Sequence, residues 1–114
     1  MEIRNTTRGT TLADRATRAD GWMQRLKGLL GRDSLQAGEG LHIDPCTSIH
    51  TFFMRFPIDV LFIDTEGMVV RAFESIRPWR ATRMYPKARS VVELPVGTLK
   101  ATETYEGDVI SFSE

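Results

Sequence analysis

The sequence of 114 residues contains one cysteine, so it cannot form a disulfide bond within the chain. Its stability must then come from a hydrophobic core, which is typical of proteins in a reducing compartment. No apolar run approaches the ~20 residues that a membrane-spanning helix needs. No apolar segment follows a basic start at the N-terminus, so we expect no signal peptide. These absences predict a soluble, cytoplasmic protein.

The sequence also lacks net charge, because it contains 15 basic and 15 acidic residues. No overall field therefore attracts nucleic acid or a membrane surface, and neither is an expected partner. The charge is nevertheless uneven along the chain. Residues 71–89 contain six basic residues and one acidic residue, whereas residues 90–114 contain five acidic residues and one lysine. A local basic surface is therefore expected. We also predict that the chain is monomeric.

Repeats, low-complexity tracts and linkers are absent, and the length predicts one domain over residues 1–114. A helical pattern occurs once, where Trp22, Leu26, Leu29 and Leu30 fall on one stripe. The remaining periodic segments are short and read as strands. The sequence therefore predicts a mainly β fold, a single-domain β-sandwich that is jelly-roll-like or a partly open barrel, with one short α-helix near residues 18–30. The expected strands are Glu2–Thr6, Thr10–Ala16, 41–43, 50–54, Asp59–Ile63, Met68–Phe73, Ser75–Pro78, Ser90–Leu94 and Val109–Phe112.

Three of these segments carry more specific expectations. Asp59–Ile63 is apolar on both faces after its first residue, which predicts a strand covered on both sides. Gly67 suits the left-handed position of a hairpin loop between this strand and the next. Thr98 is expected to cap a single helical turn over residues 98–104.

Residues 42–50 place both histidines, His42 and His50, close to Cys46. On a straight strand Cys46 and His50 would stand ~13 Å apart, too far for zinc, whose bonds are ~2.0–2.3 Å long. They can meet only if residues 47 and 48 form a turn. A metal site, a reactive thiol–imidazole pair and a buried cysteine beside a hydrogen-bonded histidine remain as alternatives, and no third metal ligand is marked by the sequence.

Charged residues interrupt apolar segments at Arg55, Asp59 and Glu93. A buried charge is costly unless it is paired. Pro57 should bend the chain between Arg55 and Asp59, so the two either form a structural ion pair or line a pocket in which Arg55 donates to an anion. Glu93 is expected to face solvent or a polar cleft, where an arginine could meet it.

Residues 76–90 combine Trp79 and Tyr85 with five basic residues. Such a segment can bind anions, stack on bases or dock an acidic partner. The alternative is a solvated loop in which Trp79 packs into the core.

Residues 25–35, 38–64, 77–80, 93–98 and 107–108 together resemble domain-of-unknown-function family 192, also catalogued as uncharacterised protein family 0127. The resemblance implies a small, single-domain, mostly β protein of sandwich or jelly-roll type, with a short helix after the first strands. It implies no activity and no catalytic residues. Many relatives carry an aromatic-Trp-Met-Lys-Asn-Thr motif where this chain has Phe-Phe-Met-Arg-Phe-Pro at residues 52–57, so the Trp, Asn and Thr are missing here.

The first functional hypothesis is a non-enzymatic binding module for a small polar or anionic ligand or a peptide, with no cofactor or metal. One alternative is a Cys/His-dependent enzyme or metal-binding protein. Another is protein or nucleic-acid interaction through the basic Arg/Trp loop, residues 76–90. The candidate ligand-binding residues are Cys46, His50, Arg55, Asp59, Arg77, Trp79, Arg80 and Glu93.

Overall fold

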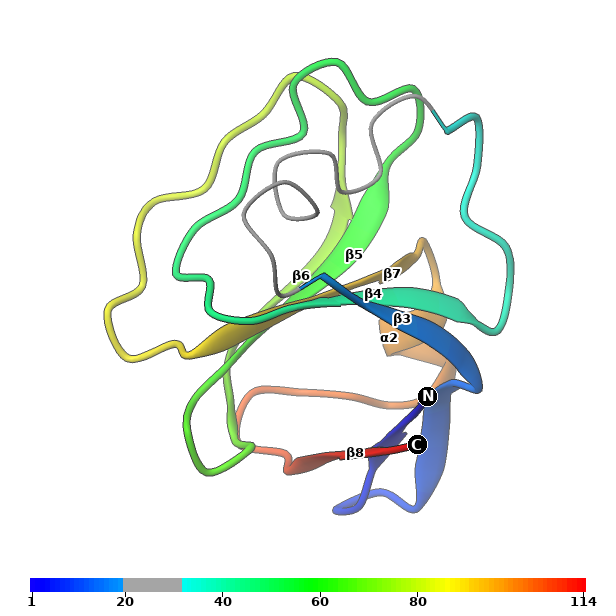
Figure 1. The fold of residues 1–114 in the computed structure, drawn as a ribbon, viewed down its shortest axis with the longest axis vertical. Coiled ribbons are helices and arrows are strands. Elements are labelled where there is room, and N and C mark those ends of the chain that lie inside the picture. The colour runs from blue at the N-terminus through cyan, green and yellow to red at the C-terminus, as the bar shows by residue number, and fades with distance from the viewer. Residues whose placement is uncertain (20–31) are drawn as a thin grey trace.

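The computed structural model describes residues 1–19 and 32–114, which form two β-sheets and one short helix (Figure 1). The smaller sheet has the strand order β2-β1-β8 and the larger one β3-β4-β7-β5-β6. Neighbouring strands are antiparallel except β3 and β4, which are parallel. The mainly β class is confirmed, as an open sandwich and not a closed barrel. The bounds are β1 Glu2–Asn5, β2 Thr10–Ala13, β3 Arg15–Ala19, β4 Glu39–Ile43, β5 Ile58–Ile63, β6 Val69–Ile76, β7 Ser90–Pro95, α2 Thr98–Ala101 and β8 Ile110–Ser113.

Strand β5 is buried along its whole length, as its apolar sequence predicts. Leu61 and Ile63 pack into a core shared with the smaller sheet, which contributes Ile3 and Ile110. The opposite face, represented by Val60, belongs to a second core that includes loop residues, which we call the outer core. The larger sheet therefore lies between two apolar layers. The predicted hairpin is also confirmed, since β5 pairs with β6 and Gly67 adopts a φ of 86° in the turn.

The predicted strand Thr10–Ala16 is instead two strands that belong to different sheets. The break lies at Asp14, where the N–H groups of Asp14 and Arg15 both donate to the carbonyl of Gly38, at 3.1 and 2.8 Å. This change of partner lets one continuous segment join the two layers. The predicted strand Ser75–Pro78 is likewise the end of β6, which continues to Ile76.

The helix predicted near residues 18–30 falls mainly outside the described residues, and Arg18 and Ala19 belong to β3. The expected helical turn near Thr98 is α2, but Thr98 is not its cap. Gly97 is the N-cap residue with a φ of 95°, and no side chain of its own can supply the acceptor. The distant carboxylate of Asp59 does so instead, accepting N–H groups from Gly97 and Leu99 at 3.1 and 3.0 Å. Among the described residues, none of the helices has the length and hydropathy to cross a membrane.

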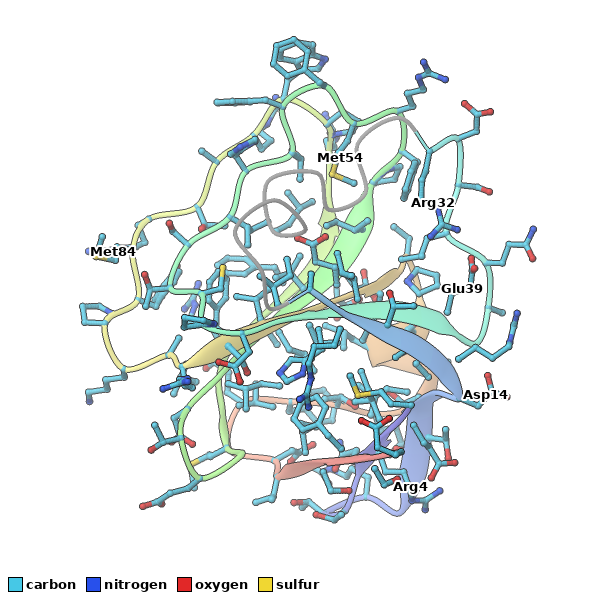
Figure 2. The ribbon with its side chains drawn as sticks, in the orientation of Figure 1. Arg4, Asp14, Arg32, Glu39, Met54 and Met84 are labelled. Atoms are coloured by element: carbon cyan, nitrogen blue, oxygen red, sulfur yellow. The ribbon has the colours of Figure 1, made fainter. Side chains whose placement is uncertain are left out.

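Two long loops, residues 44–57 and 77–89, run alongside each other over the outer face of the larger sheet (Figure 1). The predicted strand at residues 50–54 is wrong, because only His50 forms a bridge there, with Ala81. The loops are joined by backbone hydrogen bonds such as Tyr85 N–H to Thr47 O at 2.8 Å. Figure 2 shows Met54 directed into the molecule and Met84 directed outward, consistent with their exposures of 6% and 64%.

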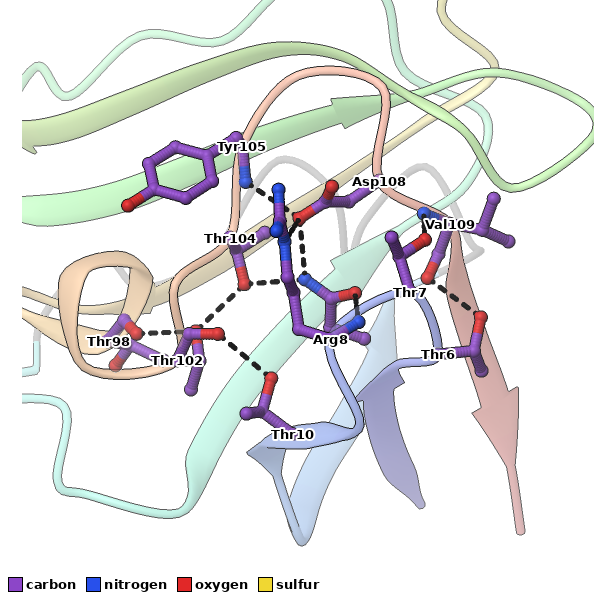
Figure 3. Close-up of polar contacts among 11 residues, drawn as sticks. Thr6, Thr7, Arg8, Thr10, Thr98, Thr102, Thr104, Tyr105, Asp108 and Val109 are labelled. Carbon is purple, nitrogen blue, oxygen red and sulfur yellow. Dashed lines mark hydrogen bonds and ion pairs between the residues drawn. The ribbon is translucent and has the colours of Figure 1, made fainter.

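A polar network fastens the β1–β2 turn to the segment that follows α2 (Figure 3). The carboxylate of Asp108 accepts hydrogen bonds from Asn5 Nδ2 at 3.0 Å, Arg8 Nε at 3.1 Å and the Tyr105 N–H at 3.0 Å. Burial opposes ionisation of Asp108, but these donors outweigh it and hold its pKa below the ordinary value. The network thus ties the two ends of the chain together.

Candidate functional site

Thr51 joins the two long loops, residues 44–57 and 77–89. It is completely buried, and its hydroxyl donates to the carbonyl of Arg77 at 2.6 Å and accepts from the Arg80 N–H at 2.9 Å. Its backbone N–H donates to Arg80 O at 2.7 Å, and its carbonyl accepts from the Trp79 N–H at 3.0 Å. Residues 77–80 are therefore held in one conformation by a single side chain and its backbone.

Four rings gather around this junction and form a continuous aromatic cluster. His50 stacks on Phe52 with ring centroids 4.9 Å apart, and Phe52 stacks on Trp79 at 6.1 Å. Phe53 meets Trp79 at 4.7 Å. Phe53 and Trp79 are 68% and 57% exposed, so the cluster lies on the surface and Trp79 does not pack into the core.

Phe53 and Trp79 both have left-handed backbones, with φ angles of 68° and 65°. This conformation crowds the Cβ atom and is uncommon for bulky residues. Strained positions of this kind persist only where the surrounding structure enforces them, and they concentrate at functional sites. Phe53 and Trp79 therefore adopt an unfavourable backbone conformation although their large apolar rings are exposed to solvent.

Basic residues flank the cluster along the chain, and the backbones of Arg77 and Arg80 are bonded to Thr51 beside it. Arg77, Arg80 and Arg83 are exposed, and none of them has an acidic partner within the described residues. Arg55 differs, because its Nη1 lies 2.7 Å from Asp33 Oδ1 in an exposed ion pair. We call His50, Phe52, Phe53, Trp79, Arg77 and Arg80 the aromatic–basic surface.

Asp59 and Glu93 lie elsewhere, inside the protein. Asp59 is fully buried and does not approach Arg55. Its carboxylate accepts three backbone N–H groups, from Ser75 at 2.9 Å and from Gly97 and Leu99 at the N-terminus of α2. The proposed ion pair of Arg55 with Asp59 is therefore wrong, and Asp59 holds the end of β6 against α2.

Glu93 faces the opposite side of the sheet from Asp59. Leu41 and Val60, its neighbours on the adjacent strands, belong to the outer core, and the residue is 5% exposed. The expectation that it faces solvent or meets an arginine is wrong for the described part of the chain, where no cation pairs with it. Burial raises the pKa of Glu93 to about 7.

Cys46 and His50 each form a hydrogen bond with a different neighbour. The thiol of Cys46 donates to the carbonyl of Ser48 at 3.0 Å and is partly buried against the outer core. His50 Nδ1 accepts the N–H of Phe52 at 3.2 Å while its ring stacks on the same residue. Within residues 1–19 and 32–114, no group of three or more His, Cys, Asp or Glu side chains is placed to hold a metal ion.

The structure thus brings together His50, Arg77, Trp79 and Arg80 from the predicted site and separates them from Asp59 and Glu93. Sequence reasoning missed Phe52 and Phe53. Their adjacency was a usable signal, because two consecutive aromatic side chains on a strand would point to opposite faces, and one of them would need cover on an exposed edge.

Comparison with known proteins gives the family context. The model of the DUF192 family, described as uncharacterized ACR, matches residues 3–112. A UPF0127 protein of Thermococcus kodakarensis is 31% identical over 115 residues, covering 97% of this chain and 73% of the relative. The sequence resemblance noted above is confirmed.

Two solved structures share the fold. A protein of unknown function from Novosphingobium aromaticivorans superimposes with a TM-score of 0.83 at 18% identity, over 97% of this chain and 82% of the other. A Sinorhizobium meliloti protein, provisionally described as a transcription regulator, gives a TM-score of 0.79 at 24% identity, over 96% and 89% of the two chains. At these identities the likeness concerns the fold alone.

Proposed function

The chain belongs to the DUF192 family of uncharacterized proteins, and we propose that it is a non-enzymatic, cytoplasmic binding module that holds an acidic peptide segment on the aromatic–basic surface. The observation that carries the proposal is the contact between Phe53 and Trp79. Each of these large rings is more than half exposed and belongs to a residue with a left-handed backbone, and the ring centroids lie 4.7 Å apart. Exposed apolar clusters bordered by polar residues are characteristic of interaction sites.

The charge at the border favours an acidic partner. Arg77 and Arg80 lack acidic neighbours within the described residues, so their guanidinium groups are available for carboxylates. Trp and Arg are among the residues that most often dominate binding energy at interfaces, and Phe is enriched in interface cores. Arg55 adds to this border only when a ligand displaces Asp33, so we expect it to contribute less than Arg80.

The scaffold favours binding to a preformed surface. The hydrogen bonds of Thr51 fix the backbone of residues 77–80 before any ligand arrives. A preformed surface loses little conformational entropy on binding, so more of the contact energy appears as affinity. A peptide that places an apolar side chain against Phe53 and Trp79, with carboxylates beside the arginines, suits both the exposed rings and the charge of this surface.

The alternatives have less support. The enzyme or metal hypothesis needs Cys46 and His50 to act together, whereas the hydrogen bonds described above join Cys46 to Ser48 and His50 to Phe52. A nucleic-acid role is favoured by exposed rings next to arginines, the arrangement on which bases stack. Zero net charge argues against it, so single-stranded DNA is included in the test below.

The test is selection of displayed peptides on the immobilised protein, followed by titration of the selected sequences. We expect acidic peptides with an aromatic or aliphatic anchor, whose affinity falls about tenfold or more in Trp79→Ser and Arg80→Gln. Tyr105→Ser and Arg4→Gln are the matched controls, because Tyr105 is 54% exposed and neither residue belongs to the aromatic–basic surface. Each variant is checked for folding by its thermal unfolding temperature.

Three results would overturn the proposal. One is selection of no peptide at all. Another is peptides that bind the Trp79→Ser variant as well as the unchanged protein. The third is tighter binding of oligo(dT) than of any peptide, with a steep loss of affinity as salt rises, which would assign the surface to nucleic acid.

A further inference from the structure

A hollow opens between the two sheets, and it shares no residue with the aromatic–basic surface. Its volume is about 310 Å³, within the range of small-molecule sites. The larger sheet contributes Arg18 and His42, β8 contributes Phe112, and Asp44 and Arg89 stand beside them. We call this hollow the intersheet cleft.

His42 is the unusual member of this cleft. It is 3% exposed, and neither ring nitrogen has a hydrogen-bond partner in the described part of the chain. Phe112 stacks on the ring at 4.0 Å with an interplanar angle of 15°. Imidazole hydrogen bonds lie in the plane of the ring, so stacking does not satisfy either nitrogen. Buried polar groups normally have a hydrogen-bond partner, so the unpaired nitrogens of His42 indicate a site where a ligand could supply one.

The protonation state of His42 follows from its surroundings. Burial lowers its pKa, the charge of Asp44 raises it, and the charge of Arg18 lowers it. The net effect is a pKa below the ordinary value, so the ring is neutral near pH 7. A neutral imidazole offers one N–H donor and one acceptor.

The charges around the ring leave one cation available. The carboxylate of Asp44 is held by Arg89, whose Nε lies 2.7 Å from Oδ1. Asp64, on the turn that borders the cleft, accepts the N–H groups of Glu66 and Met68 at 2.9 Å. Arg18 has no acidic partner among the described residues. The guanidinium group of Arg18 is therefore available to pair with an anionic group.

The walls indicate what the anion is attached to. Ile63, Ile110 and Phe112 line the cleft with apolar surface. A guanidinium group binds a carboxylate with two parallel hydrogen bonds, and the apolar walls suit a short hydrocarbon body.

We propose that the intersheet cleft binds a small organic monocarboxylate with an aromatic or short aliphatic body. Its carboxylate pairs with Arg18 and accepts the N–H of His42. Both nitrogens are shielded from solvent, so Phe112 and the residues at the edge of the imidazole must shift together before the carboxylate can reach the N–H in the plane of the ring, and the body of the acid then packs against the apolar wall of the cleft. Phe112 is suited to this movement because it is only partly buried and lies in β8, the C-terminal strand.

Nuclear magnetic resonance of the imidazole C–H groups tests the proposal. The chain has two histidines, so its spectrum contains one buried probe, His42, and one exposed reference, His50. A His50→Gln variant assigns the two signals. Benzoate, butyrate and inorganic phosphate are titrated separately at pH 7 and constant ionic strength.

We expect benzoate and butyrate to shift the His42 signal saturably and to leave His50 unchanged. Arg18→Gln should weaken this binding about tenfold, as expected for loss of a charge-assisted pair. Arg4→Gln, which removes an arginine outside the cleft, should bind as the unchanged protein does. The His42→Phe variant keeps an aromatic ring stacked on Phe112 but has no N–H to donate. We expect it to lose affinity for benzoate as well, which saturation transfer on the benzoate signals measures.

The proposal is overturned if neither acid produces a saturable shift of His42, or if Arg18→Gln binds benzoate as tightly as the unchanged protein. Binding of phosphate without binding of either acid would overturn the carboxylate assignment. Because the two surfaces share no residue, each of these outcomes is independent of peptide binding at the aromatic–basic surface.

Discussion

Asp59 and Glu93 are buried carboxyl groups on adjacent strands of one sheet, but they face opposite sides of it. Asp59 has three backbone N–H donors on its carboxylate. Glu93 has no hydrogen-bond or ion-pair partner within the described residues, and burial alone raises its pKa to about 7. The same type of group therefore stabilises the fold at one position and opposes it at the other.

We predict that the contribution of Glu93 to the free energy of unfolding falls as the pH rises from 5 to 8. Its pKa is about 7 in the folded protein and near 4.5 when unfolded. Between these values the folded state retains a proton that the unfolded state has lost, so folding weakens as the pH rises and the loss levels off above 7. The difference corresponds to about 3 kcal/mol.

The measurement is urea unfolding at pH 5 and pH 8 for the unchanged protein and for Glu93→Gln. The variant should lose the decrease in stability that Glu93 contributes as the pH rises, and it should be the more stable protein at pH 8. Glu66→Gln, at an exposed loop position, is the control and should retain the pH dependence. A Glu93→Gln variant that is less stable than the unchanged protein at pH 8 would show that the carboxylate has a stabilising partner.

Asp59→Asn should lower the free energy of unfolding by about 2 kcal/mol or more, because an amide nitrogen would replace one of the accepting oxygens. The loss should be accompanied by faster amide hydrogen exchange at Leu99 and Ser75. Asp33→Asn is the comparison, since it removes a carboxylate from an exposed ion pair, which is worth at most about 1 kcal/mol. Equal effects of the two substitutions would contradict a structural role for Asp59.

Strand β5 and Asp59, its second residue, show how far the sequence could predict the structure. The run of apolar residues in β5 was sufficient to predict a strand covered on both faces. The role of Asp59 was not predictable, because its donors come from residue 75 and from residues 97 and 99, and only the folded chain brings them together. The aromatic residues at 50–54 suggested a strand, but the bonds of Thr51 to residues 77 and 80 formed instead.

Asp108→Asn should destabilise the protein at neutral pH by about 1–3 kcal/mol, because it disturbs the donors that converge on this carboxylate. The pKa of Asp108 is lowered on folding, so its contribution is present above the unfolded pKa near 3.8 and is lost as the pH falls through the lower, folded value. Acid unfolding monitored by circular dichroism should therefore be shallower in the variant. Glu106→Gln on the same loop should leave the acid transition unchanged.

Cys46 should react with a chromogenic disulfide more slowly in the folded protein than in urea. Its thiol is partly buried against the outer core and donates to the carbonyl of Ser48, and reactivity requires an accessible thiolate. Addition of a chelator should not change the rate. A reaction faster than that of the unfolded chain, or one released by chelator, would support the Cys/His enzyme or metal hypothesis instead.

Thr51→Val tests whether the aromatic–basic surface depends on its scaffold. Valine matches threonine in shape but cannot donate to Arg77 O or accept from the Arg80 N–H, which leaves buried polar groups unpaired at a cost of about 1–3 kcal/mol. Amide hydrogen exchange should accelerate at residues 79 and 80 and remain unchanged in β5 and β7. Affinity for selected peptides should fall although every ring and guanidinium group is still present. Thr65→Val, at an exposed turn position, is the control. If Thr51→Val kept full affinity while residues 79 and 80 exchanged faster, peptide binding would not require the preformed loop, and the left-handed backbones of Phe53 and Trp79 would need another explanation.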